Sequence, residues 1–488
     1  MIRYVFLFLI LYGPAWGTET EMGNFAQVTA SNHLLFSNSK DPSDKEAQPS
    51  GHLMHEATVG AHYGTLHTDI QFANRFFVSN PEGPDNPFVL EKKRLELEWK
   101  NWELKLGDSH EQLGKGIALS LYRDPAFGID NTLEGASIKF QSSGLRTKFF
   151  LGRINALHAP VAINPQSNPV EGRNVWLAGA SAHVNAGAQI EAGPHYLAAL
   201  SQPSGTTRYD KSWHTVGATF SKSELWQNFD LYLESNVLFW QHSTIGVAEM
   251  QPVGTGSYGS LSWVSAPWKV KLESKNYRQY TFEFQKPPTL EEEIVLSSNT
   301  IDVFASRLSI ERTLGRASVQ ASYLQGYDRF LDTSIHHGVL GSKFAGPLGL
   351  QNEVRGGYRT LPGHNNLIHA ALKTKLKTFK AQSIEFGVRS QHQVENLDLS
   401  PATEDRHRLE LTYVFSKSLN LQLGYEYIPT NGEAAGRHFA NLGGSYQIAK
   451  LSTRAFVGQT GGGTECSAGV CRRVQPYSGF MLETYYTF

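Results

Sequence analysis

Apolar and polar residues alternate along much of this chain with a period of two. The pattern is clearest at residues 94–100, 269–273, 408–413 and 419–427, where one set of alternate positions is aliphatic or aromatic and the other is charged or amide. Because successive side chains of a β-strand point to opposite faces of the sheet, this pattern predicts strands with one apolar and one polar face.

The expected strands are joined alternately by short turns and long polar loops. Short turns are expected near 64–65, 101–102, 142–144, 185–187, 267–268, 314–315, 346–347, 377–380, 417–418 and 450, and long loops over 40–50, 80–87, 155–170, 202–210, 285–300, 394–403, 429–436 and 461–472. Outer-membrane barrels have short periplasmic turns and longer extracellular loops, whereas a soluble β-sandwich has no reason to alternate in this way. The sequence therefore predicts an all-β fold, a transmembrane antiparallel β-barrel of about 24 strands (roughly 16 to 26), if residues 103–123 form one long or kinked strand.

Composition agrees with a barrel and argues against other classes. Aromatic residues make up 11% of the chain, yet the mean hydropathy is only −0.33, as expected when every lipid-facing residue alternates with a polar one. After residue 17, no apolar stretch reaches the roughly 20 residues that a membrane-spanning helix needs. A net charge of −1 gives no indication of nucleic-acid binding.

Both ends of the chain carry export and assembly signals. Arg3, the apolar run 4–11 and the small-x-small triplet 15–17 predict a signal peptide over residues 1–17, leaving 18–488 as an outer-membrane barrel. In the last strand, one set of alternate residues is apolar or aromatic apart from a single threonine, and the given sequence ends on an aromatic of this set; the members of this face are Phe480, Leu482, Thr484, Tyr486 and Phe488. The ending resembles outer-membrane barrels whose final strand is recognised by the barrel-assembly machinery, so the expected partners are that machinery and outer-membrane lipid.

The two cysteines, Cys466 and Cys471, are separated by four residues that include Gly469. In an oxidising compartment, this spacing predicts a local disulfide that stiffens a loop tip. Metal binding is the weaker alternative, because no second ligand pair has a matching spacing.

One segment is unusually rich in glycine and polar residues. It runs from Gly107 to Ile117 as Gly-Asp-Ser-His-Glu-Gln-Leu-Gly-Lys-Gly-Ile and is followed by Gly128-Ile-Asp-Asn. The segment resembles a group of outer-membrane barrels, common in Bacteroidota, that is known only as a domain of unknown function. That group often has basic residues at the positions of Ser120 and Pro125. The resemblance implies the fold and the cellular location, but no activity.

This segment has two open interpretations. It forms either a structural kink with a capped turn, or a constriction that contacts a solute. Its polar side chains are too hydrophilic for lipid contact and should point into the lumen or an inward loop; the candidates are Asp108, His110, Glu111, Gln112, Arg123, Asp130 and Asn131.

Charged residues of both signs lie on the polar faces of the expected strands. Among them, Arg94, Glu96, Arg389, Arg408 and Glu410 are candidates for the pore lining. They form either ordinary cross-strand ion pairs in a solvated lumen or opposed arrays whose transverse field orders a permeant.

Enzymatic and cofactor chemistry find little support. The chain has 18 histidines but no HExxH or comparable ligand spacing, and it contains no GxSxG and no phosphate-binding glycine loop. We therefore expect no enzyme activity, no metal site and no cofactor.

The sequence thus predicts an outer-membrane channel or transporter for an unidentified solute or polymer, narrowed by residues 107–131 and 155–170. The alternative is a structural or docking protein with an occluded lumen and partner-binding loops. Export of a polymer together with a periplasmic partner is a third possibility.

Deletion of Phe488 should impair barrel assembly, because it removes the aromatic residue at the end of the last strand. The measurement is loss of the heat-modifiable folded band on a gel. A normal yield of folded protein would contradict this interpretation of the last strand.

Overall fold

The computed structural model describes most of the chain outside the ends and the long connections. It covers residues 27–40, 50–77, 88–124, 129–154, 174–187, 189–202, 211–226, 228–244, 247–280, 288, 290, 302–329, 332–361, 365–378, 382–397, 400–429, 436–461, 463–467, 470–474 and 477–487. The expected signal peptide, the loop 155–170 and Phe488 lie outside these residues.

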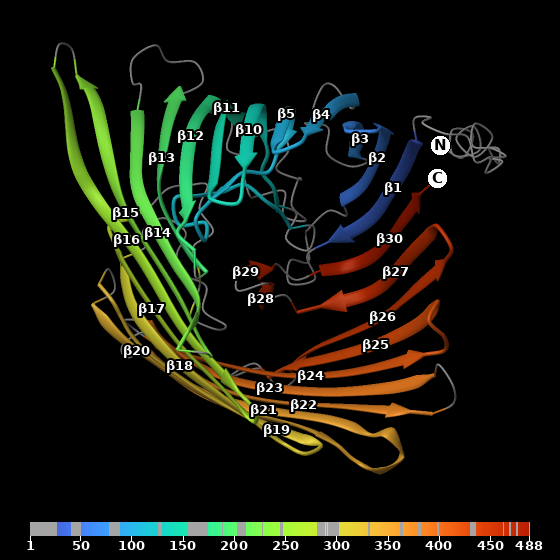
Figure 1. Ribbon diagram of the computed structural model, residues 1–488. Coiled ribbons are helices and arrows are strands. Elements are labelled where there is room, and N and C mark those ends of the chain that lie inside the picture. The colour runs from blue at the N-terminus through green and yellow to red at the C-terminus, as the bar shows by residue number, and fades with distance from the viewer. Residues whose placement is uncertain are drawn as a thin grey trace.

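A single antiparallel sheet of 24 strands closes on itself (Figure 1). The wall strands are β1 (Gln27–Lys40), β2 (Ser50–Tyr63), β3 (Leu66–Phe77), β4 (Phe88–Trp99), β5 (Trp102–Ser109), β10 (Leu133–Gln141), β11 (Leu145–Ile154), β12 (Asn174–Asn185), β13 (Ile190–Gln202), β14 (Lys211–Leu225), β15 (Phe229–Thr244), β16 (Val247–Ser265), β17 (Trp268–Arg278), β18 (Val303–Leu314), β19 (Ala317–Asp328), β20 (Thr333–Ala345), β21 (Gln351–Leu361), β22 (Asn365–Lys377), β23 (Ser383–Leu397), β24 (Ser400–Val414), β25 (Leu419–Ile428), β26 (Arg437–Ile448), β27 (Leu451–Thr460) and β30 (Tyr477–Thr487). Each strand pairs with the next, and β30 also pairs with β1, from Ser31 opposite Thr487 to Lys40 opposite Ser478. The predicted all-β barrel of about 24 strands is confirmed.

Helical structure is nearly absent from the described residues. Its one instance is a 3-10 turn, η3 (Pro347–Gly349). No helix among the described residues is long and apolar enough to cross a membrane.

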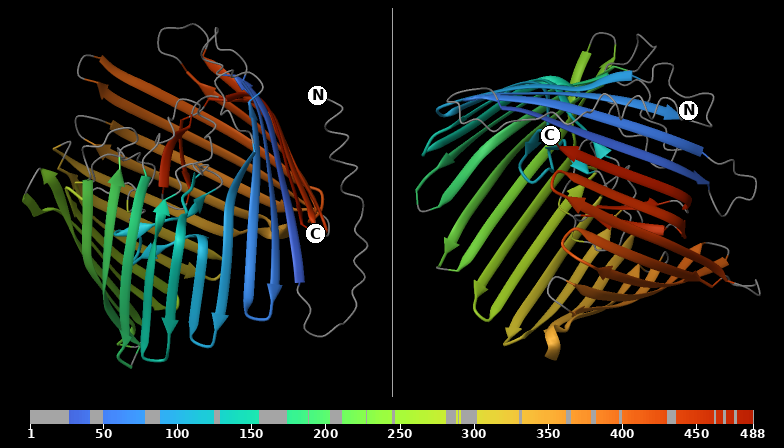
Figure 2. Two further views of the ribbon diagram at one scale, coloured as in Figure 1. Left: turned by 90° about the horizontal axis from the view of Figure 1, so that it is seen from above. Right: turned by 90° about the vertical axis from the view of Figure 1, so that its right-hand side faces the viewer.

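The connections at the two ends of the barrel differ in length (Figure 2). At one end the strands are joined by short turns such as 64–65, 100–101 and 449–450, whereas the other end has connections such as 155–173 and 279–302. The loop expected at 394–403 is wrong, because β23 and β24 continue through it and leave only 398–399 between them. The single strand expected over 103–123 is also wrong, because β5 ends at Ser109 and the chain there leaves the wall.

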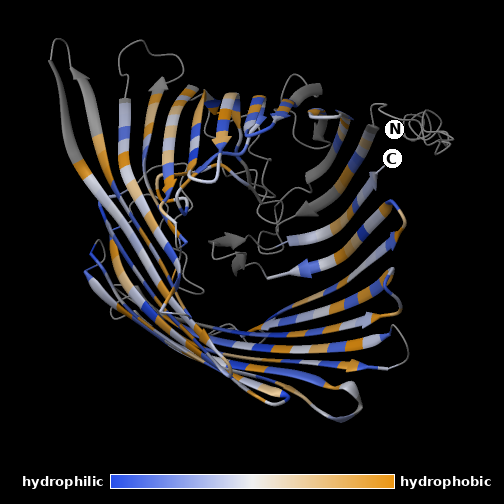
Figure 3. Ribbon diagram, in the orientation of Figure 1, coloured by the Kyte–Doolittle hydropathy of each residue, from blue (hydrophilic) through white to orange (hydrophobic). Residues whose placement is uncertain are grey.

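Hydrophobic and hydrophilic residues alternate along the wall strands (Figure 3), so one face of the wall is mainly apolar and the other mainly polar. Large apolar side chains are exposed around the outside, including Leu97, Phe149, Leu272, Ile368 and Leu423. An exposed apolar surface of this extent is what lipid requires and what water opposes.

Aromatic residues gather on the outer face next to the short turns. Trp99 and Trp102 lie opposite each other beside turn 100–101, and Trp226, which directly follows β14, is 79% exposed. The ring of Trp268, beside turn 266–267, lies 4.6 Å from the Arg312 guanidinium. Such rings are typical of the water–lipid boundary of membrane proteins.

Farther from the short turns, tyrosine–histidine pairs join neighbouring strands on the outer face. The hydroxyl group of Tyr196 lies 2.6 Å from Nδ1 of His214, and the equivalent distance from Tyr323 to His336 is 3.0 Å. The next residue, His337, points to the inner face, where its Nε2 is 3.1 Å from Nε2 of His369. Adjacent histidines therefore face opposite sides of the wall, as the alternation predicts.

The two faces of one strand provide a direct test of the lipid contact. Leu423 on the outer face of β25 should tolerate arginine poorly, and Leu423→Arg should destabilise the folded barrel by about 2–4 kcal/mol. Its neighbour Gln422 lies on the inner face, so Gln422→Arg should cost much less. Urea unfolding in lipid bilayers measures both, and equal losses would contradict the assignment of the faces.

Candidate functional site: a segment folded into the lumen

Between β5 and β10 the chain leaves the wall, and residues 110–124 and 129–132, called here the inward segment, lie inside the barrel (Figure 1). The two strands pair with each other directly below the segment, with Ser109 opposite Leu133. The segment contains two small ladders, β6 (Gln112–Leu113) with β7 (Leu119–Ser120) and β8 (Arg123–Asp124) with β9 (Ile129–Asp130).

A buried carboxylate holds the two ends of the segment together. Asp108 accepts hydrogen bonds from the Lys93 backbone N–H at 2.8 Å and from the Thr132 hydroxyl at 3.1 Å. Gly107 makes this junction possible, because its φ is +93° and a Cβ there would lie 1.9 Å from the carbonyl oxygen of Lys93. The glycine is thus required by both backbone conformation and space.

A second buried carboxylate ties the segment to β11. Glu111 is 1% exposed, accepts a hydrogen bond from the Ser109 hydroxyl at 2.8 Å and forms an ion pair with Lys148. Its backbone carbonyl oxygen accepts a hydrogen bond from the Leu121 N–H at 2.8 Å. A carboxylate buried to this degree needs such partners, because burial without them costs several kcal/mol.

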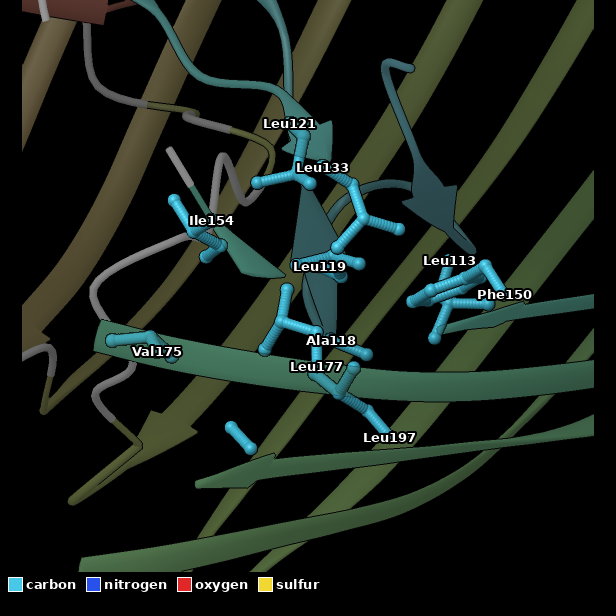
Figure 4. Packing of buried hydrophobic residues seen from close by; sticks show 11 residues of the cluster. Leu113, Ala118, Leu119, Leu121, Leu133, Phe150, Ile154, Val175, Leu177 and Leu197 are labelled. Carbon is cyan, nitrogen blue, oxygen red and sulfur yellow. The ribbon is translucent and has the colours of Figure 1, made fainter. Parts of the chain in front are cut away.

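Apolar side chains of the segment pack on the inner wall (Figure 4). Leu113, Leu119 and Leu121 form a cluster with Leu133 and with side chains of the inner face of β11–β13, namely Phe150, Ile154, Val175, Leu177, Leu197 and Ala199. Ile117 is fully buried in a second cluster with Leu238, Tyr258, Tyr277 and Tyr280. Part of the lumen is therefore filled by a hydrophobic core.

The third attachment is to Glu234 of β15. This 3% exposed carboxylate accepts hydrogen bonds from the Lys115 backbone N–H and the Tyr232 hydroxyl, both at 2.7 Å, and from the Asn236 amide at 3.0 Å. Gly114 lies against it with φ +59°, and a Cβ there would come within 2.2 Å of Glu234 Oε1. The segment is thus attached to β11 through Lys148 and to β15 through Glu234, and it packs on the inner wall through the two apolar clusters.

The structure places the candidate residues of the segment in different environments. Asp108 and Glu111 are buried in the contacts above, whereas His110 and Gln112 are exposed and Asn131 is half-buried. The backbone register pairs Arg123 with Asp130, but their side chains lie outside the described set.

The other lumen candidates fall on two separate parts of the wall. Arg94 pairs with Asp69 and lies 3.9 Å from Glu96, on β3 and β4. Arg389 and Arg408 are opposite each other on β23 and β24, and Arg408 lies 3.0 Å from Glu410. Among the described residues no group of three or more metal-ligating side chains is present.

Sequence reasoning missed Lys148 and Glu234. Both lie in alternating strands, where the pattern identifies them only as two of many polar lumen residues. Their specific role follows from contacts with the segment at sequence separations of 37 and 119 residues.

Residues 89–286 match DUF6029, a family of unknown function. The matched range contains the inward segment together with Lys148 and Glu234, which hold it. The resemblance to a domain of unknown function is thereby confirmed for this part of the chain. No curated protein sequence matches the chain.

Solved structures with a similar fold are outer-membrane barrels. A chain of the E. coli P pilus tip assembly intermediate PapC–PapD–PapK–PapG is 10% identical with a TM-score of 0.53, over 97% of this chain and 62% of that one. The P pilus usher PapC translocation pore is 10% identical with a TM-score of 0.47, over 94% and 99%. Pseudomonas aeruginosa OccK9 is 11% identical with a TM-score of 0.40, over 75% and 98%. Of these three, only the first has a TM-score above 0.5, and at 10% identity it supports the barrel fold alone.

Replacing Lys148 by methionine should loosen the inward segment, because Glu111 then remains buried without its cation. We expect the free energy that holds the segment on β11 to fall by about 3–5 kcal/mol. The measurement is faster proteolysis within residues 110–132. The double variant Glu111→Gln, Lys148→Met should recover much of it. Lys139→Met, whose lysine lies 3.2 Å from Glu103 and is no anchor of the segment, is the control. Equal proteolysis of Lys148→Met and wild type would argue against this role for the ion pair.

Proposed function

We propose that the protein is an outer-membrane channel or transporter whose water-filled lumen is constricted by the inward segment. The observation that carries the proposal is the attachment of this segment to the inner wall through Glu111, Glu234 and two apolar clusters. A wide barrel needs an internal element to become selective, because a lumen formed by this many strands is far wider than side chains can fill.

The outer surface supports the location. Apolar side chains cover the outside of the wall, and tryptophans flank the short turns, which is the arrangement that a bilayer selects. The proposal includes export through cleavage after residue 17, insertion by the barrel-assembly machinery, and short turns on the periplasmic side. The kinship with Bacteroidota barrels remains part of this proposal.

Within the constriction, the candidate residues divide by role. Asp108 and Glu111 position the segment, because their carboxylates are used in its attachment. His110 and Gln112 are exposed and are the residues that would meet a solute.

Cys466 and Cys471 belong to a hairpin, β28 (Gly463–Ser467) with β29 (Val470–Val474), in which the two residues are directly opposite. Figure 1 places this hairpin inside the ring of strands. A cross-strand pairing is compatible with the proposed disulfide, which would stiffen the hairpin inside the ring of strands.

An occluded docking protein is the second candidate, favoured by the amount of apolar packing inside the barrel. Ion conductance of the purified chain in planar bilayers distinguishes the two, since stable current steps require a continuous aqueous path. Absence of current from correctly folded protein would overturn the channel proposal in favour of docking.

Glu234→Ala should increase the single-channel conductance, because the Lys115 N–H loses its acceptor and the segment is released from β15. Glu191→Ala is the matched control, since Glu191 pairs with Arg146 near a short turn and is no anchor of the segment. Unchanged conductance of folded Glu234→Ala would contradict a constriction held at this point.

A further inference from the structure

The hairpin of β2 and β3 brings two histidines together beside turn 64–65. His62, near the end of β2, is directly opposite His67, near the start of β3. Leu66 and Ile70 of β3 are exposed on the outer face, so alternation turns both histidines towards the lumen. His62 is exposed and His67 is half-buried, which leaves the pair accessible from water at this mouth of the barrel.

The two imidazole rings approach each other through the same nitrogen. Nδ1 of His62 lies 3.3 Å from Nδ1 of His67, and the rings meet at 62° with their centroids 5.6 Å apart. Two nitrogens that are each bonded to a tetrahedral zinc ion at about 2.0–2.1 Å are themselves about 3.3–3.4 Å apart. The pair therefore already has the spacing at which one metal ion binds both rings.

The other ring nitrogen of His67 is held by a carboxylate. Its Nε2 lies 3.1 Å from Oδ2 of Asp69, and Asp69 in turn forms an ion pair with Arg94 of β4. A neutral imidazole that donates its Nε2–H to a carboxylate keeps an unprotonated Nδ1. Histidines that bind metals almost always have such a partner, because it fixes the ring and makes the ligand nitrogen more basic. Asp69 therefore prepares His67 to offer its Nδ1 lone pair to a metal ion.

The pair supplies two ligands and leaves the remaining positions of an ion open. Glu96 is opposite His67 on β4, but its oxygens lie near Lys105, at 3.5 Å, and Arg94, at 3.9 Å. Within the described part of the chain, no third metal-binding side chain joins the two histidines. A tetrahedral ion held by both rings would thus keep two positions for water or for donor atoms of a solute.

A second pair of inner-face histidines lacks the features that favour a metal ion. Nε2 of His337 and Nε2 of His369 are also close, at 3.1 Å, but these residues are only 3% and 5% exposed. His337 is directly opposite Arg359, and the charges of Arg359 and Arg307 act on it. Burial and neighbouring positive charge both oppose a cation there, so this pair serves as a control for the first.

We propose that His62 and His67 bind one divalent transition-metal ion, such as Zn²⁺, Ni²⁺ or Cu²⁺, at the short-turn mouth of the lumen. Imidazole nitrogens suit these ions, whereas Mg²⁺ and Ca²⁺ prefer oxygen ligands. The two histidines are brought together across a two-residue turn and not on one face of a helix, so the sequence alone indicated no metal site. The inference does not depend on the proposed channel, and absence of current would leave it standing.

The test is calorimetric titration of the full chain with ZnCl₂, after purification in detergent without a histidine tag and removal of metals by a chelator. Wild type should bind one equivalent more tightly than the rest, and His62→Ala and His67→Ala should each lose it. Asp69→Asn keeps both ligands and should weaken this binding by about 10–100-fold. His337→Gln is the control and should bind like wild type. Folded yield is verified for each variant by heat modifiability.

Modification of histidines by diethyl pyrocarbonate, mapped by mass spectrometry, locates the ion in the wild-type protein and so does not depend on how the variants fold. Zn²⁺ should protect His62 and His67, Mg²⁺ should protect neither, and His110 of the inward segment, which is also exposed, should react equally in both. Equal Zn²⁺ affinity of wild type and folded His62→Ala overturns the inference, as does failure of Zn²⁺ to protect the pair more than His110.

Discussion

The requirement that every backbone polar group find a partner inside the protein governs this structure. Hydrocarbon offers no hydrogen bonds, so a sheet that contacts lipid on its outer face cannot end in an open edge. The pairing of β30 with β1 removes both edges, and it joins residues 450 positions apart, such as His33 and Glu483 at 3.1 Å. The exposed leucines outside and the charged residues inside are stable only because this closure separates lipid from water.

Closure also creates a large interior, and the inward segment uses it as a second folding environment. Ile117 and Leu119 are fully buried although they lie within the lumen, because the wall residues of the two apolar clusters replace solvent around them. Two buried carboxylates then fix the orientation of this small core. Glu111 neutralises Lys148, and Glu234 accepts backbone and side-chain hydrogens, so the polar contacts specify a position that apolar packing alone would leave less defined.

Alternation together with the lengths of the connections predicted a barrel of about 24 strands, and alternation alone predicted that neighbours such as His336 and His337 face opposite sides, because lipid and water impose a period of two on every wall strand. It failed for residues 103–123, where one strand was expected. Beyond Ser109 the burial of each residue is decided by distant wall strands, and no local period records those contacts. The glycine-rich motif places Glu111 and Asn131 in one segment. No feature of the sequence marks Lys148 and Glu234 as the residues that hold this segment. Alternation identified Arg389 and Arg408 as lumen residues, but their position directly opposite each other follows only from the register of β23 and β24.

The pairing of β5 with β10 beneath the inward segment makes closure of the barrel independent of the element that narrows its lumen. Because Leu133 already stands opposite Ser109, the cylinder is complete without residues 110–132. Changes in the length or chemistry of that insertion need not disturb the hydrogen-bond ladder around it. The width and chemistry of the lumen can therefore change during evolution, or be re-engineered, while the barrel wall stays the same.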